Sequence, residues 1–228
     1  MKCFCASEKL WRSIMKKYKV IAFDLDGTLT NPESGQLTGF EYALKKHGVS
    51  YPSREWLKRY IGPPIHDVWQ ADFGLSLEAV IEMIETYREY YNVYGFRENE
   101  IYEGIPEMLE TLKKRGYTLV VATGKPEKIA NKILHLFSLD KYFDFIGGAS
   151  EDDSRHRKSD ILKYVLDAVG ARSEEALLIG DRSFDAEGAR ALGASSMGVA
   201  WGHGSAEELE AAGFDAIVKT TDEILNKL

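Results

Sequence analysis

The sequence is poor in cysteine and has no long apolar run, and both absences narrow its class. Its 228 residues include only two cysteines, Cys3 and Cys5, which are too close together to cross-link distant segments. Such usage is typical of a reduced, cytoplasmic protein and not of a disulfide-stabilised secreted one. No apolar stretch approaches the ~20 residues that a membrane helix needs. We therefore expect a cytoplasmic protein without a membrane partner.

The sequence also lacks an excess of positive charge. The chain has 36 acidic and 29 basic residues, which gives a formal net charge of −7, and it contains no block of Lys or Arg. A nucleic-acid polymer or an anionic membrane would require clustered positive charge, so neither is expected as a partner. The hydrophobic fraction of 44% is ordinary for a globular protein. The length suggests one large domain, or one domain that carries an insertion.

Residues 1–17 are interpreted as an N-terminal extension. The segment is basic but lacks a continuous apolar stretch, which makes it a poor secretory signal. Met15 directly precedes the first strand-like run, so we expect it to be the natural start and residues 1–14 to be dispensable. Cys3 and Cys5 have no second Cys or His pair at ligand spacing, which favours free thiols over a metal site.

From Tyr18 onward, short apolar runs alternate with helical segments. The runs are mostly continuous, and continuous apolar runs suit strands that are buried on both faces of a parallel sheet. The helical segments 104–116 and 159–169 have readable ends, with Pro106 in a first turn and a glycine after each last turn. The expected strands lie within residues 18–24, 117–123, 142–148, 176–181, 195–200 and 215–219. This alternation predicts a doubly wound α/β fold, a Rossmann-like three-layer core with a mostly parallel sheet.

One segment, residues 34–98, interrupts the alternation because it shows helical periodicity and no convincing strand. Apolar residues recur there at helical spacing, which predicts an amphipathic helix with one buried face. The stripe consists of Leu77, Val80, Ile81, Ile84, Tyr87 and Tyr91. We expect residues 34–98 to form a helical, lid-like cap domain, inserted into an α/β core made of residues 18–33 and 99–228.

The strongest chemical signal is the segment 20-VIAFDLDGT-28, in which a buried strand leads into two aspartates. Side chains alternate along a strand, so Asp24 and Asp26 project to the same side. Ligands of α/β sheets bind beyond the carboxyl ends of the strands, where this pair is expected. Two carboxylates so close together repel each other unless a cation lies between them or one of them is protonated. The string therefore indicates a functional site and not an ordinary acidic turn.

A second acidic pair, Asp181 and Asp185, follows another apolar strand in 179-IGDRSFD-185. Either residue alone could be a helix cap. Following a second strand of the same sheet, however, both can converge with Asp24 and Asp26 into an oxygen-rich pocket. Oxygen ligands without His or Cys indicate Mg²⁺.

Two further positions, Thr123 and Lys158, balance this negative charge. Thr123 is expected to end the strand 117–123, and the N–H groups that begin at Gly124 are expected to open a helix and to bind a phosphate. Lys158 begins the helix that follows 154-SRHRK-158, where Arg155 and Arg157 are competing cations. Only the combination with the aspartates favours Lys158.

Two other classes of protein have the same α/β pattern, but the sequence lacks the motif that each of them requires. A dinucleotide-binding enzyme needs G-x-G-x-x-G after the first strand, and the turn here is DLDGT. A P-loop NTPase needs G-x-x-x-x-G-K-[ST], and the lone pair 124-GK-125 lacks both the upstream glycine and the hydroxyl residue.

The four ordered motifs, DLDGT at 24–28, Thr123, Lys158 and GDRSFD at 180–185, resemble the phosphatase branch of the haloacid dehalogenase superfamily. The likeness extends from about Tyr18 to the end of the chain. Residues 61-IGPP-64 and the ending from Gly202 resemble the phosphoglycolate phosphatase-like group, some members of which are assigned as 5′-nucleotidases. Asn31 departs from that group, which often has Asp there.

This resemblance implies a mechanism and assigns roles. Asp24 would attack phosphorus and form an aspartyl-phosphate, and Asp26 would act as general acid and then as general base. Mg²⁺ would be held by Asp24, the Asp26 carbonyl and Asp181, with Asp185 a ligand through water or an orienting group. Thr123 and Lys158 would hold the nucleophile and the phosphoryl oxygens. The expected activity is hydrolysis of a small phosphorylated metabolite, of the phosphoglycolate or nucleoside 5′-monophosphate type.

Two readings remain open within this family. A phosphosugar mutase uses the same pair of aspartates, and a binding protein without activity could retain the fold. Asp26 favours a phosphate monoester, because an alkoxide leaving group needs a proton and a halide does not.

Overall fold

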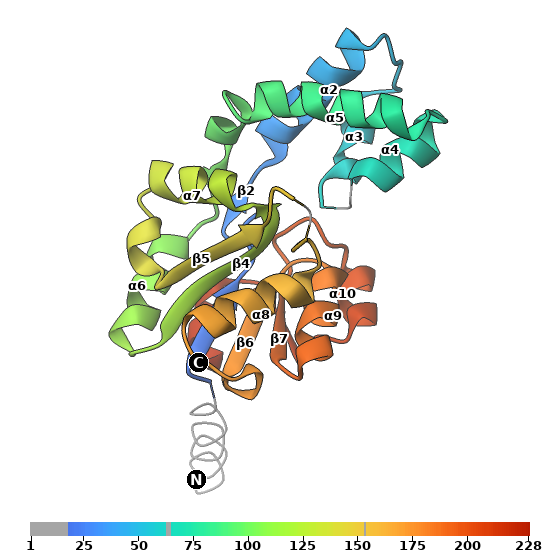
Figure 1. Cartoon of the computed structure of the whole chain (residues 1–228). Coiled ribbons are helices and arrows are strands. Elements are labelled where there is room, and N and C mark those ends of the chain that lie inside the picture. Colours follow the sequence, from blue (N-terminus) through green and yellow to red (C-terminus); the bar gives the residue numbers. More distant parts are fainter. Residues whose placement is uncertain (1–17, 63–64, 153) are drawn as a thin grey trace, which may run out of the picture. The chain divides into compact units, whose positions relative to one another are not determined.

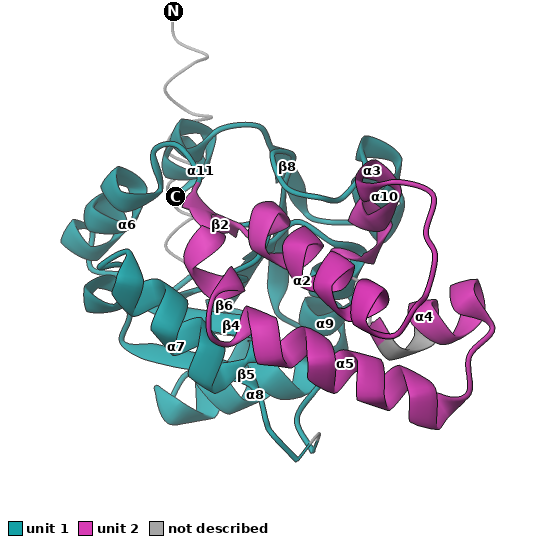
Figure 2. Cartoon of the chain, turned by 90° about the horizontal axis from the view of Figure 1, so that it is seen from above, with its two compact units in different colours: residues 1–29, 102–228 teal, residues 30–101 magenta. Residues whose placement is uncertain are grey.

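The structure is a computed structural model that describes residues 18–62, 65–152 and 154–228 (Figure 1). The predicted extension, with Met15 and both cysteines, lies outside the described residues. The described chain forms two compact units (Figure 2). One unit contains the residues up to Leu29 together with Tyr102–Leu228, and the other is Thr30–Ile101.

The first unit is built on a six-stranded parallel sheet in the order β5-β4-β1-β6-β7-β8. Its strands are β1 (Val20–Phe23), β4 (Thr118–Pro126), β5 (Phe145–Ala149), β6 (Ala176–Gly180), β7 (Ser195–Val199) and β8 (Ala216–Val218). Every residue of β1 and β6 is buried, as expected for central strands that are covered on both faces. The prediction of a Rossmann-like α/β core is confirmed.

Alternating side chains of the central strands face opposite helical layers. Val20 and Ala22 of β1 join a core cluster with residues of α8 (Lys158–Ala168) and with Ala189 of α9 (Ser183–Leu192). The helices α6 (Ile105–Lys114) and α7 (Glu127–Leu136) lie on the other face (Figure 1). The remaining helices of this unit are α10 (Ala206–Ala212), α11 (Thr221–Lys227) and the short 3₁₀ turns η3 (Asp140–Tyr142) and η4 (Ser173–Glu175). The three layers are thus held together by apolar side chains on both sides of the sheet.

The second unit is helical apart from one short strand pair. β2 (Thr30–Asn31) pairs antiparallel with β3 (Glu100–Ile101). The helices between them are α2 (Glu33–Lys46), α3 (Arg54–Leu57), η1 (Lys58–Tyr60), α4 (Ile65–Phe73), α5 (Leu77–Tyr91) and η2 (Gly95–Glu98). The division between the units falls at 29/30 and 101/102 and not at the expected 33/34 and 98/99, because the strand pair belongs to the inserted unit.

The predicted amphipathic helix is present as α5, but its buried face differs from the expected stripe. Val80, Ile84 and Tyr91 are buried, whereas Leu77 and Ile81 are 50% and 45% exposed. Met83, which the expected stripe omitted, is buried among the core residues of this unit. The hydrophobic pattern therefore identified the helix but not its exact orientation. Among the described residues, no helix has the length and apolar character that crossing a membrane would require.

The core of the helical unit is organised around Trp69. Its side chain is fully buried, and its ring meets those of Phe40, Tyr60 and Phe73 with centroids 5.8, 6.3 and 6.3 Å away. Within the described part of the chain, the indole N–H of Trp69 has no hydrogen-bond partner. The side chain thus contributes through packing and not through a polar contact.

We expect Trp69→Ala to lower the free energy of unfolding by about 3–5 kcal/mol, because it leaves a large cavity among aromatic rings. Trp69→Phe keeps a ring and loses no hydrogen bond, so its loss should be clearly smaller. Urea unfolding followed by circular dichroism measures both values. Equal losses for the two variants would contradict the packing role.

Candidate active site

The carboxyl ends of β1 and β6 place two aspartates side by side. The two strands pair in register, with Phe23 opposite Ile179, and the Asp24 amide donates to the Ile179 carbonyl at 2.9 Å. Asp24 follows β1 directly, and Asp181 follows β6. Neighbouring parallel strands end at the same edge of a sheet, so the register itself brings these residues together.

Asp185 reaches the same point from the first turn of α9. Its Oδ2 accepts a hydrogen bond from the Arg182 amide at 3.1 Å, which fixes the side chain at the start of the helix. One carboxylate oxygen each from Asp24, Asp181 and Asp185 lie within 4.8 Å of one another. Asp181 and Asp185 are each 1% exposed. Three of the four predicted metal-ligating aspartates therefore form one buried cluster.

Gly27 allows the loop after β1 to approach Asp181. The residue has a φ of +82°, and a Cβ there would lie 2.1 Å from Asp181 Oδ2. The next residue, Thr28, donates its hydroxyl to Asp181 Oδ1 at 3.3 Å. A side chain at position 27 would thus displace the carboxylate from the cluster.

Lys158 supplies the positive charge inside the cluster. Its Nζ lies 3.0 Å from Asp24 Oδ1 and 2.8 Å from Asp185 Oδ1, and it donates to the Ala122 carbonyl at 3.0 Å. Burial acts to lower the pKa of Lys158, but Asp185 and Asp24 outweigh it, so the pKa is raised and the ammonium stays charged. Lys158 is the first residue of α8, where a cation opposes the helix dipole. The carboxylates explain this placement.

Arg155, the competing cation, is engaged elsewhere. Its guanidinium pairs with Glu127 at 3.0 Å, donates to the Gly148 carbonyl at 2.9 Å and lies over the Tyr164 ring at 3.7 Å. These contacts hold the segment that leads into α8. Arg155 therefore supports the loop before Lys158 and does not enter the carboxylate cluster.

Burial raises the pKa of Asp185, and it also raises that of Asp181. Burial, followed by the nearby Asp185 and Asp24, raises the pKa of Asp181 to about 8. A group whose pKa is raised on folding stabilises the fold below its ordinary pKa, and this stabilisation is lost as the pH rises through the folded-state value. Without a further cation, ionisation of Asp181 at neutral to mildly alkaline pH is therefore unfavourable.

Asp26, the fourth predicted ligand, is not part of the three-carboxylate cluster. Its carboxylate pairs with the ammonium of Lys125, whose side chain is only 6% exposed. In the sequence, Lys125 stands out only as part of the incomplete P-loop motif 124-GK-125. The sequence signal for this ion pair is a lysine at the end of a buried strand, because a buried lysine needs an acidic partner.

The prediction that Thr123 ends its strand is wrong. β4 continues to Pro126 with a register irregularity between Ala122 and Pro126, and α7 begins only at Glu127. The N–H groups after Gly124 therefore do not open a helix. Thr123 is buried beside Ala122, and its hydroxyl accepts from the Lys125 amide at 3.2 Å, while Gly124 is exposed. Both residues lie at the site edge, on an irregular strand end.

The donor set fits a magnesium ion. All three clustered groups are hard oxygen ligands, and no soft or imidazole ligand belongs to the cluster. Three ionised carboxylates beside one ammonium leave two negative charges, which a dication would neutralise. The raised pKa of Asp181 is the expected property of such a site without its ion.

Comparisons with known proteins found a matching family and several similar proteins. The model of the haloacid dehalogenase-like hydrolase family matches residues 21–199. A 5′-nucleotidase of Pseudomonas aeruginosa is 39% identical over 200 residues, which cover 88% of this chain and 90% of that protein. The tyrosine-protein kinase PtkA of Mycobacterium tuberculosis is 35% identical over 212 residues, which cover 92% of this chain and 72% of that protein.

A solved structure of similar fold is that of a predicted phosphatase from Clostridium acetobutylicum. It superposes with a TM-score of 0.87 at 37% identity, and the match covers 92% of this chain and 97% of the other. The likeness therefore includes both compact units and not the sheet alone. The chain belongs to the haloacid dehalogenase-like hydrolase family.

Proposed function

We propose that this hydrolase is a Mg²⁺-dependent phosphatase that cleaves nucleoside 5′-monophosphates or a closely similar small phosphate monoester. The observation that carries the proposal is the buried cluster of Asp24, Asp181 and Asp185 around the Lys158 ammonium. The similarity to a 5′-nucleotidase along most of both chains supports the substrate class.

Asp24 acts as the nucleophile in this proposal. It is the most exposed carboxylate of the cluster, at 13% for the side chain, whereas Asp181 and Asp185 are closed off. Its Oδ1 is held by the Leu25 amide at 2.8 Å and by Lys158, which leaves Oδ2 for attack on phosphorus. Bond formation to phosphorus with departure of the alkoxide gives an aspartyl-phosphate, and this divides one difficult displacement into two easier ones.

Asp26 acts as general acid toward the leaving group and then as general base toward the attacking water in this proposal. It gives a proton to the departing alkoxide oxygen and later takes one from the water that hydrolyses the aspartyl-phosphate. The Lys125 ammonium holds Oδ2 of Asp26 and so orients the group. Proton transfer is assigned to Oδ1.

Asp24, the Asp26 carbonyl, Asp181 and, directly or through water, Asp185 would hold Mg²⁺. When bound, the ion supplies charge that offsets the repulsion between an anionic nucleophile and a dianionic phosphate. Lys158 contributes a positive charge between Asp24 and Asp185. Thr123 and Gly124 are assigned to the phosphoryl oxygens, and the inserted helical unit to exclusion of water during transfer.

A panel of phosphorylated metabolites, with release of inorganic phosphate as the readout, tests the substrate class. Nucleoside 5′-monophosphates should show the highest kcat/KM. A preference for phosphoglycolate would change the substrate and leave the phosphatase intact. Isomerised sugar phosphate without phosphate release would indicate a mutase instead, and transfer from ATP to tyrosine a kinase.

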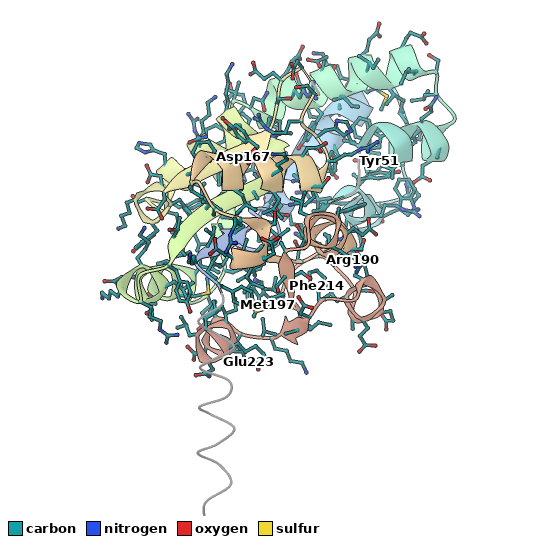
Figure 3. All side chains as sticks on the ribbon, turned by 60° about the horizontal axis from the view of Figure 1, so that its bottom comes forward. Tyr51, Asp167, Arg190, Met197, Phe214 and Glu223 are labelled. Carbon is teal, nitrogen blue, oxygen red and sulfur yellow. The ribbon has the colours of Figure 1, made fainter. Side chains whose placement is uncertain are left out.

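Asp24→Asn should lower kcat on p-nitrophenyl phosphate by more than about a thousandfold, because an amide cannot act as the nucleophile. Asp167→Asn is the matched control. Asp167 lies on α8 and is labelled in Figure 3, and its carboxylate accepts a hydrogen bond from the exposed Lys163 at 2.7 Å, so its variant should retain full activity. Substantial turnover by Asp24→Asn would overturn the covalent mechanism.

Two substrates with different leaving groups distinguish the role of Asp26 from that of Asp24. Asp26→Asn should reduce kcat/KM far more for a nucleoside 5′-monophosphate than for p-nitrophenyl phosphate, because nitrophenolate departs without a proton. Lys125→Met should show the same selectivity to a smaller degree. Equal losses on both substrates would exclude a proton-transfer role for Asp26.

Mg²⁺ affinity should rise with pH, because binding requires ionised Asp181 and its pKa is about 8. One competing proton implies up to about a tenfold gain per pH unit below that value. Calorimetric titrations at about pH 6 and about pH 8, each in two buffers of different ionisation enthalpy, give both the affinity and the protons released. EDTA should abolish turnover and added Mg²⁺ should restore it, and activity in EDTA would contradict the metal requirement.

A further inference from the structure

The loop between β7 and α10 closes around one carboxylate. Residues 201–204 follow Ala200, whose amide donates to the Val218 carbonyl at 2.9 Å. Ser205 then caps α10 by accepting from the Glu208 amide at 3.1 Å. Both ends of this four-residue loop are therefore fixed, and the loop itself lies against Asp181.

Asp181 receives one neutral donor on each oxygen. The His203 amide donates to Oδ2 at 2.8 Å, and the Thr28 hydroxyl donates to Oδ1 at 3.3 Å. Among the described residues, no cationic side chain forms an ion pair with Asp181, although it is 1% exposed beside two other carboxylates. Neutral donors fix the orientation of a carboxylate but leave its charge largely uncompensated.

Two glycines let the loop approach this closely. A Cβ at Gly202 would lie 2.3 Å from Asp181 Cβ and 2.4 Å from the Gly27 carbonyl oxygen. A Cβ at Gly204 would lie 2.1 Å from the Asp181 carbonyl oxygen. These are contacts with backbone or with the first side-chain atom, so they cannot be relieved by rotating a flexible side chain.

Trp201 joins this loop to the nucleophile loop. Its indole Nε1 donates to the Thr28 carbonyl at 3.1 Å, and Thr28 is the residue whose hydroxyl holds Asp181. The ring of Trp201 also meets that of Tyr102, with centroids 6.5 Å apart. The same side chain thus fixes the distance between the donor on Oδ1 and the donor on Oδ2.

We infer that Trp201 is a positioning residue of the metal site, which through its indole N–H and the loop 201–204 orients the Asp181 carboxylate toward a divalent cation. The inference rests on the proposed function for the identity of the ion. Groups that orient a metal ligand affect affinity strongly even though they never touch the metal. The role assigned to Trp201 is therefore measured best by metal binding.

The experiment compares Mg²⁺ dissociation constants, measured by calorimetry on the full chain at low temperature, where a destabilised variant remains folded. Trp201→Phe removes the indole donor and keeps a ring, and it should weaken Mg²⁺ binding about tenfold. Gly202→Ala adds the clashing Cβ, and its effect should be at least as large. Trp56→Phe is the matched control in the helical unit, where Trp56 packs against the rings of Tyr60 and Phe73, and should leave the constant unchanged.

Thermal unfolding without metal separates positioning from general stability. A positioning role predicts that Trp201→Phe reduces Mg²⁺ affinity even when its midpoint without metal equals that of the Trp56→Phe control. An unchanged Mg²⁺ constant for both Trp201→Phe and Gly202→Ala would overturn the inference while leaving the phosphatase proposal standing. A wild-type chain that binds no Mg²⁺ would instead refute the metal site itself.

Discussion

Mutual repulsion among three buried carboxylates is the constraint on which the rest of the site depends. Asp24, Asp181 and Asp185 have oxygens within 4.8 Å of one another, and two of these residues are almost fully buried. Buried charges are tolerated only where they are paired. Lys158 pairs with two of the three groups, and this explains a cation at a helix start, where the dipole disfavours it. The negative charge that remains favours a divalent cation.

The parallel sheet itself brings most of this cluster together. β1 and β6 are neighbours in register, so the residues that follow them meet without any long side chain to bridge a gap. Asp185 comes from the helix that follows β6, and Lys158 from the helix before it. All four groups therefore depend on short connections at one sheet edge. Substitutions in the buried strands should affect the site only through stability, whereas substitutions in these connections should affect its geometry.

Much of this arrangement could be predicted from the sequence. The apolar runs identified all six strands of the sheet, and their polar ends identified the residues that cluster. The failures have local physical causes. β4 passes Thr123 because a register irregularity extends the strand, and composition carries no signal for it. Leu77 and Ile81 fit a helical period, but tertiary packing selected Met83 for the core instead. Lys125 and the loop at Trp201 act through tertiary contacts that no spacing rule encodes.

The three carboxylates of the site are stabilised in two different ways. Lys158 is covalently part of the chain, so its ammonium contacts Asp24 and Asp185 as soon as α8 packs on the sheet. Asp181 has neutral donors instead, and its pKa of about 8 allows it to remain protonated near neutral pH when no ion is bound. Under the proposed metal dependence, binding of a dication would release this proton. Lys158 would then supply its charge with or without the ion, while affinity for the ion would depend on how firmly the surrounding loops hold Asp181.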